Sequence, residues 1–568
     1  MVYGARSEIA AIIISLLWLC AFFIDQKRIY DSCQNTCVCI KAPAVLVLLS
    51  GLFIGLYAAS AVWGKGYLSL APLEKIDNGT QHLDSLFHSS VAESYRHFPY
   101  ASTLLNGEAF LKYHTFSHLL MGIVSWVMGM PSLVAYCFLY PSVFLPLYFL
   151  AILIAVSYAK NYFNGRGEVN FTDVAVIMLF IAGGISASVL NRYGIWKTSY
   201  ILSESFLVAN TLAFFSYGLF FRALKASGSR TQIRMLLLIV IPFLVFVITW
   251  SKISVGFLFT LSTVYFVLRK GMKNWKYWIV IVVNCLVFMV ALFLFNWSGT
   301  SAGNGLFSSI KWMAFGEKCS GRLGIWGHYL LLLTLPALFL LLDTVKNKYD
   351  FKSIAEAGTV WIEVVIIICL AAFLPGLLID IAGGSAVYFS YFAEIPPLIL
   401  LCGRNCLDMD KCTKRSVKIL VYTAVFCWCI FWSYTNRADD PLESISGEHS
   451  SGLSGLLLDI RESADGEQEK YTVYLDDNSP ADMVFDDERC ACYVFPAMTG
   501  IGVINATYCQ DGTCYSYRGE KAEDGYFMDL TDNEKNMTFD EALAKAKEMG
   551  KKGLIHFVDS GYEIVYTE

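Results

Sequence analysis

Several long apolar stretches, among them residues 132–158, 199–221, 277–296 and 358–381, constrain this chain more than any other feature. An α-helix needs about 20 apolar residues to cross the ~30 Å hydrocarbon core of a bilayer, and these stretches are about that long. The composition agrees, because 56% of the residues are hydrophobic, only 16% are charged, and the mean hydropathy is +0.51. Soluble globular proteins are less apolar than this. We therefore expect a multi-pass α-helical protein of the plasma (cytoplasmic) membrane.

The apolar stretches, taken in order, predict about 12 transmembrane helices, with a range of 11 to 13. The candidate spans lie near residues 9–24, 42–63, 132–158, 173–190, 199–221, 235–251, 253–268, 277–296, 325–343, 358–381, 385–402 and 417–434. The first one lacks a small-residue cleavage site and ends at a charged segment that contains Lys27 and Arg28. It is therefore expected to be a retained signal anchor rather than a cleaved signal peptide.

The basic residues between the spans predict which loops share a side of the membrane. Short loops rich in Lys and Arg stay in the cytoplasm, and such loops lie at residues 222–234, 269–276, 346–352 and 404–415. If the apolar stretch 115–130 crossed the membrane, these loops would fall outside. We therefore expect a helix on the outer membrane surface at 115–130, with a full crossing as the alternative. Residues 64–131, 297–324 and the tail after Tyr434 then face outward.

The chain divides into two predicted domains at the last apolar span. Residues 1–435 form the transmembrane domain with a large first external loop at 64–131. Residues 436–568 are acidic and polar and form a small soluble α/β domain outside the membrane. In it, alternating apolar residues predict strands at 471–475, 553–558 and 562–566. A capped helix is expected to follow Thr538.

The cysteines of the tail are the ones expected to be oxidised. Cys490, Cys492, Cys509 and Cys514 form two close pairs in a domain placed outside the cytoplasm, which favours two disulfides between the pairs. The sequence does not select the connectivity.

Histidines gather in the predicted external loop. Five of the eight histidines lie between His82 and His118. If residues 81–96 are helical, Asp84 and His88 stand one turn apart on the same face. A carboxylate beside an imidazole can act as a general base, or the two can hold a divalent ion. We predict Asp84 and His88 to be catalytic.

Other residues of this loop add charge and hydrogen-bonding groups. The predicted substrate-binding residues here are Glu93, Arg96, Tyr113, His114 and His118. For any single histidine, a surface position without function is the better interpretation, whereas the cluster as a whole favours function. The loop lacks the Glu of H-E-x-x-H, so a zinc protease is not supported and no metal ligands are assigned. A divalent cofactor is left open.

Charged residues within apolar sequence give further candidates. Lys252 lies between two apolar runs, where a cation implies a partner or a water-filled site. It can bind a phosphate, or extend its charged end from the membrane surface into water. Arg322, in the later external loop, is a weaker candidate of the same kind. The carboxylates Glu204, Asp380 and Glu394 suit either a cavity or helix packing.

One family combines these features. An apolar span is followed by an external loop with Asp84-x-x-Phe87-His88, the segment Gly107–His114 and a surface helix ending at Gly129, and then by many further spans and an external tail. This order of segments resembles the GT-C superfamily of membrane glycosyltransferases. The resemblance implies an essential acidic residue in the first external loop, here Asp84, which faces a polyprenyl-phosphate sugar donor and deprotonates the acceptor hydroxyl. An extra amino-terminal span departs from the family, and a W-W-D motif is absent from the sequence.

The expected function is transfer of a sugar from a polyprenyl-phosphate-linked donor to a glycan or lipid acceptor, as in polysaccharide biosynthesis for the cell envelope. A transporter or flippase for lipid-linked glycans is the alternative of a different class, and a polysaccharide polymerase or ligase is a third. The net charge of −5 argues against a nucleic-acid partner.

Overall fold

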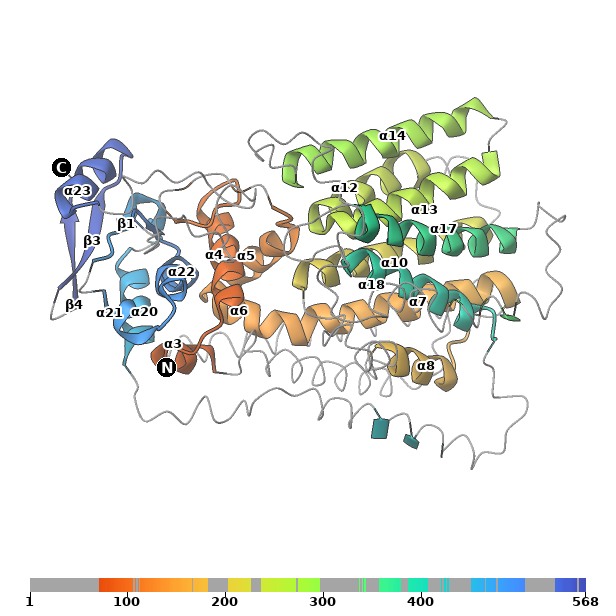
Figure 1. Ribbon diagram of the computed structural model, residues 1–568, viewed down its shortest axis with the longest axis horizontal. Coiled ribbons are helices and arrows are strands. Elements are labelled where there is room, and N and C mark those ends of the chain that lie inside the picture. Colours follow the sequence, from red (N-terminus) through yellow and green to blue (C-terminus); the bar gives the residue numbers. More distant parts are fainter. Residues whose placement is uncertain are drawn as a thin grey trace.

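A computed structural model gives the fold, and it is mostly helical (Figure 1). The structure describes residues 71–105, 108, 111, 113–165, 167–181, 203–225, 236–271, 274–296, 357–378, 387–406, 451–464, 466–476, 479–505, 537–558 and 561–567, with a few helical residues between 337 and 428. The predicted spans at 9–24 and 42–63 lie outside the described residues.

Apolar helices form a bundle along the long axis of the molecule (Figure 1). Its helices, π-helical turns (η) included, are α6 (Ser132–Leu139), η1 (Tyr140–Phe144), α7 (Leu145–Asn164), α8 (Phe171–Ile181), α10 (Glu204–Lys225), η2 (Leu236–Val240), α12 (Ile241–Ser251), α13 (Ile253–Gly271), α14 (Trp275–Ala291), η3 (Leu292–Asn296), α17 (Ala357–Leu378) and α18 (Val387–Gly403). Within the described part, three helices are long and apolar enough to span a membrane: Ser132–Asn164, Glu204–Arg222 and Trp275–Phe295. Four shorter apolar helices of the described part also belong to the bundle: Leu236–Ser251, Ile253–Arg269, Val360–Ala372 and Tyr388–Gly403.

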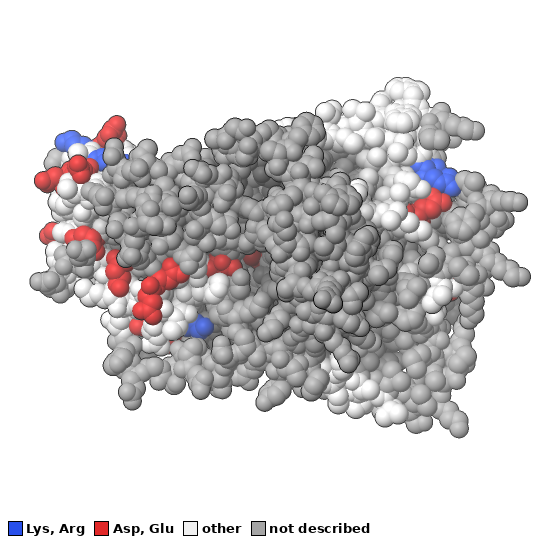
Figure 2. Space-filling view, in the orientation of Figure 1, with Lys and Arg blue, Asp and Glu red and all other residues white. Residues whose placement is uncertain are grey.

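The outside of the bundle is suited to lipid. Exposed residues of α14 include Trp278, Val282 and Leu286, and the described surface over α14 is mainly uncharged in Figure 2. Acidic side chains gather at the other end of the molecule in the same view. Because large exposed apolar surfaces are unstable in water, the bundle belongs in a membrane.

The direction of two helices shows which end of the bundle lies next to α4 and α5 and which end lies away from them. Helix α10 begins at Glu204, which lies next to α4 and α5. Helix α13 begins at the same end of the bundle, because Lys252, the residue before it, contacts His114. At 1.5 Å per residue, both helices end about 30 Å away. The described ends of both helices, Lys225 and Gly271, therefore lie at the end of the bundle away from α4.

The predicted external loop forms a layer of short helices at the first end of the bundle (Figure 1). It contains α3 (Pro72–Asp77), α4 (Leu83–His97) and α5 (Phe116–Met128). With 13 residues, α5 reaches about 20 Å and is too short to cross the bilayer. It ends at Gly129, which takes a left-handed conformation with φ 65°. Ile123, Trp126 and Val127 on α5 are exposed, as expected of a helix at a membrane surface.

A small α/β unit caps this layer. It contains α20 (Leu453–Ser463), the 3₁₀ helix η6 (Gln468–Lys470), β1 (Tyr471–Val473), α21 (Pro480–Val484), α22 (Glu488–Thr499), β2 (Gly502–Val503), α23 (Phe539–Glu548), β3 (Gly553–Val558) and β4 (Gly561–Tyr566). The strand order is β2-β1-β3-β4, with β1 parallel to both neighbours and β3 antiparallel to β4. The helix expected after Thr538 is α23, which begins with a capping box between Thr538 and Glu541.

The cysteines of this unit are only partly described. Cys490 lies on α22 and is buried, with its sulfur 3.7 Å from the carbonyl oxygen of Gln81. Cys509 and Cys514 lie outside the described residues. The two disulfides stay a prediction.

Close packing of α4 on α5 depends on one glycine, Gly122. A Cβ atom at this position would lie 2.5 Å from the carbonyl oxygen of Ala92 on α4. Since that oxygen is in the backbone, Gly122→Ala is expected to push the helices apart and to destabilise the protein by about 1–3 kcal/mol. The measurement is the apparent unfolding temperature in detergent. Gly455→Ala on α20 is the control, because a Cβ there meets nothing within 4 Å. An unchanged unfolding temperature for Gly122→Ala would contradict this packing.

Candidate functional site

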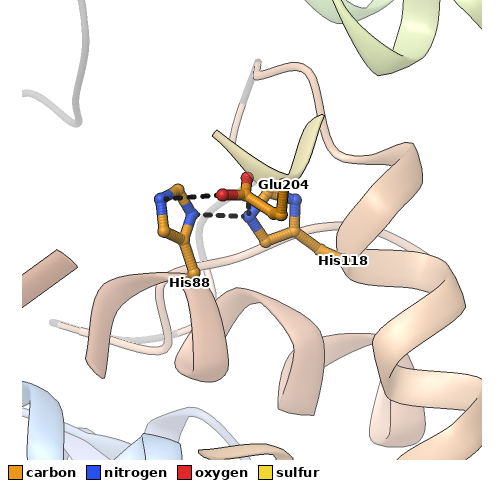
Figure 3. Close-up of side chains that lie close together, drawn as sticks. All are labelled: His88, His118 and Glu204. Carbon is orange, nitrogen blue, oxygen red and sulfur yellow. Dashed lines mark hydrogen bonds and ion pairs between the residues drawn. The ribbon is translucent and has the colours of Figure 1, made fainter. Parts of the chain in front are cut away.

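Two histidines and a glutamate meet where α4, α5 and α10 converge (Figure 3). His88 Nδ1 on α4 lies 2.8 Å from His118 Nε2 on α5. Glu204, the first residue of α10, places Oε2 3.7 Å from His88 Nε2 and Oε1 3.9 Å from His118 Nε2. All three residues are buried. We call His88, His118 and Glu204 the His–Glu cluster.

Local structure explains how each member reaches this point. His88 lies in the part of α4, Ser85–Ser94, in which every residue is buried. His118 stands one turn before Gly122 on α5, on the face that packs closely on α4. Glu204 begins α10, where a carboxylate is stabilised by the unpaired backbone N–H groups of the helix start. Helix packing therefore brings together residues that are distant in sequence.

The surroundings lower the pKa values of His118 and His114. Burial, and next the neighbouring His88, lower the pKa of His118 to about 3, although Glu204 partly opposes them. Desolvation, followed by the Lys252 ammonium, holds the pKa of His114 well below its ordinary value of 6.5. Neutral imidazoles have a ring nitrogen lone pair that can accept a proton or bind a metal ion. The ligand atoms of the His–Glu cluster lie within 4.8 Å of one another.

Lys252 lies in the short break between α12 and α13. It ends α12 in an extended conformation with φ −160° and ψ 117°, and its side chain is buried. Its Nζ is 3.1 Å from His114 Nε2 and 4.1 Å from the centre of the Tyr388 ring. The Tyr113 ring packs on His114, with ring centres 3.7 Å apart. The structure thus brings the predicted residues Lys252, His114 and Tyr113 together.

Asp84 lies on α4 one turn before His88 and is half-buried. Both ring nitrogens of His88 face His118 and Glu204 rather than Asp84. Among the described residues, the Asp84 carboxylate has no hydrogen bond or ion pair, and it lies close enough to Tyr136 to act on its hydroxyl electrostatically. The Tyr136 ring stacks on His88 with centres 6.0 Å apart. Asp84 is therefore next to the cluster but outside it.

Glu93 and Arg96 lie in a separate network. The buried Glu93 carboxylate accepts hydrogen bonds from Arg96 Nη1 (3.1 Å), Arg461 Nη1 (3.0 Å) and the Ser132 backbone N–H (2.7 Å). Burial alone would raise the pKa of Glu93, but the charges of Arg461 and Arg96 outweigh it and hold the pKa far below 4.5. Arg96 also donates to the Met130 carbonyl oxygen at 2.9 Å. Both side chains predicted to bind substrate therefore bond to protein groups.

The other charged residues predicted for the site are only partly within the described part of the chain. Arg322 and Asp380 lie outside the described residues. Glu394 is buried on α18. Glu204 was predicted only as a carboxylate within apolar sequence. Its place at the start of a span, on the side of the histidine-rich loop, was the one signal that could have linked it to His88 and His118.

Comparisons with known proteins add little. No protein-family model matches this chain, and no curated protein matches it. Among solved structures, it is similar to the archaeal oligosaccharyltransferase AglB from Archaeoglobus fulgidus in complex with an inhibitory peptide and a dolichol-phosphate. The identity is 12%, the TM-score is 0.33, and the match covers 88% of this chain and 69% of that one. A TM-score this low assigns neither fold nor activity.

Proposed function

We propose that this protein is a membrane glycosyltransferase that moves a sugar from a polyprenyl-phosphate-linked donor to a glycan or lipid acceptor on the outer face of the membrane. The observation that carries the proposal is the buried Lys252 at the break between α12 and α13, next to His114. A polyprenyl-phosphate donor has its phosphate at the membrane interface and its tail among the lipids. Its enzyme therefore needs a cation at the end of an apolar helix bundle.

The position of Lys252 suits the phosphate of such a donor. Placing a charged side chain at membrane depth costs roughly 2.5–3.5 kcal/mol on insertion scales, so charges there are usually functional. The exposed apolar residues Ile123, Trp126 and Val127 of α5 belong to the same end of the molecule. A lipid tail along the bundle would thus carry its phosphate towards the level of Lys252.

Asp84 is the proposed general base. Its carboxylate would take the proton of the acceptor hydroxyl while the acceptor oxygen attacks the anomeric carbon of the sugar. The bond between that carbon and the phosphate oxygen breaks at the same time, and the phosphate leaves with the electron pair. Lys252 would stabilise the negative charge that develops on the leaving phosphate. One displacement of this kind inverts the anomeric configuration.

Replacing Lys252 tests the phosphate site. Lys252→Met keeps a long side chain without the charge, and we expect binding of polyprenyl phosphate to weaken about 10- to 100-fold, as for loss of a hydrogen bond to a charged group. Binding is measured with the purified protein in lipid nanodiscs. Lys276→Met is the control, because Lys276 is an exposed lysine at the start of α14. Equal affinity for Lys252→Met and the wild type would refute the phosphate role.

A further inference from the structure

The His–Glu cluster has the composition of a metal site. Two imidazole nitrogens and a carboxylate oxygen come from three helices, and the ligand atoms lie within 4.8 Å of one another (Figure 3). We propose that His88, His118 and Glu204 bind one divalent transition-metal ion of the zinc type. Two histidines and one glutamate are a known ligand set of zinc sites, with Zn–N and Zn–O bonds of about 2.0–2.2 Å. The proposal concerns binding and does not depend on the proposed function.

Glu204 supplies the strongest support. Its side chain is 1% exposed, and among the described residues its Oε1 atom has no hydrogen-bond partner. The distances of 3.7 and 3.9 Å to the histidine nitrogens are too long for hydrogen bonds. A carboxylate buried in this way is costly unless a cation or hydrogen-bond donors compensate for it. A metal ion between the three side chains would provide that charge.

The distances inside the His–Glu cluster would need only small side-chain shifts for a metal ion to bind. Ligands at about 2.1 Å from a tetrahedral metal lie roughly 3.3 Å apart. His88 Nδ1 and His118 Nε2 are slightly closer than this, at 2.8 Å, whereas Glu204 Oε1 lies 3.9 Å from His118 Nε2 and Glu204 Oε2 lies 3.7 Å from the other ring nitrogen of His88, Nε2. Because the ligand atoms lie within 4.8 Å of one another, side-chain shifts of about an ångström would complete the geometry. The three helices need not move apart.

Neighbouring groups orient the two rings. His118 Nδ1 lies 3.3 Å from Ser117 Oγ, which leaves Nε2 directed at Glu204 and His88. His88 stacks on Tyr136. Metal-binding histidines usually have their second ring nitrogen held by a polar group in this way, because it fixes the ring and its tautomer.

The ligand set also selects the metal. Imidazole nitrogens favour zinc and related ions, whereas magnesium and calcium prefer oxygen ligands. Three protein ligands leave a fourth position for water or for an oxygen of a bound molecule. The ion would also link α4 and α5 to α10, and so join the layer of short helices to the bundle.

Direct metal measurements test the proposal. The full-length protein is purified through an affinity tag that contains no histidine, and bound Zn²⁺ and Co²⁺ are counted by elemental analysis. We expect one equivalent of either ion, the visible absorption bands of tetrahedral Co²⁺, and no displacement by millimolar Mg²⁺. X-ray absorption at the zinc edge should show imidazole scattering in the wild-type protein.

Variants assign the ligands. His118→Ala and Glu204→Gln should each weaken Zn²⁺ binding more than about 100-fold, because loss of a group that only orients a ligand already costs 10- to 100-fold. His556→Ala is the matched control on β3 and should retain full binding.

The outcomes separate clearly. Substoichiometric zinc, equal affinity in the cluster variants, or a zinc-edge spectrum without imidazole would overturn the site. If a variant does not fold, the wild-type spectrum still decides. A metal-binding protein that transfers no sugar would refute the proposed function and leave this site intact.

Discussion

Asp84→Asn is expected to lower sugar transfer by about 10²- to 10⁴-fold, the usual contribution of a general acid or base. The substitution keeps the size and hydrogen-bonding capacity of the side chain but removes the base. Asp84 is half-buried, and within the described structure its carboxylate has no partner. Folding should therefore change little. The measurement is transfer from a labelled polyprenyl-phosphate sugar by purified protein in nanodiscs.

Two controls make the Asp84 result specific. Glu74→Gln removes a carboxylate that is exposed on α3, and its transfer rate should match the wild type. The affinity for polyprenyl phosphate should also be unchanged in Asp84→Asn, because the base acts on the acceptor. Wild-type turnover in Asp84→Asn would remove Asp84 from the mechanism.

Glu93→Gln is expected to destabilise the junction between α4 and the α/β unit by about 3–5 kcal/mol, as measured for other buried ion pairs that lose one partner. The change leaves Arg461, which is 8% exposed, without its carboxylate partner inside the protein. It also weakens the bond to the Ser132 N–H. The readouts are the apparent unfolding temperature and the rate at which protease separates the α/β unit from the bundle.

The pH dependence gives this prediction a second readout. The folded protein holds the pKa of Glu93 far below 4.5, so ionised Glu93 stabilises the fold at every pH above about 4.5. As the pH falls below that value, the unfolded state takes up a proton that the folded state refuses, and this stabilisation is lost. The difference in unfolding temperature between wild type and Glu93→Gln should therefore be largest near neutral pH and shrink in acid. A difference that is small at neutral pH would show that the Glu93–Arg461 pair contributes little.

Much of the fold was predictable because it depends on local sequence. Apolar stretches such as 132–158 and 235–251 predict helices, and the structure has helices at Ser132–Asn164 and Leu236–Ser251. The signals after Thr538 predict the capping box and helix α23. Loop charges predict that 115–130 does not cross the membrane, and α5 is a short helix with an exposed apolar face. The predicted number of about 12 spans extends beyond the residues described.

The candidate site was only partly predictable. The sequence by itself located the histidine-rich segment, identified Asp84 and His88 as neighbours on one helix, and marked Lys252 as an unusual cation. Helical periodicity and local charge carry these signals, since they act over a few residues. It did not indicate that Glu93 is directed at Arg461, which is 368 positions away.

Only the tertiary structure decided which of these groups meet. It brings His88 to His118 across 30 positions and places Lys252 on His114 across 138. It also joins Glu204, the start of a helix in the bundle, to two histidines of a different segment. The physical reason is that side chains far apart in sequence come together through helix packing. The closeness of that packing depends on details such as the missing Cβ atom of Gly122.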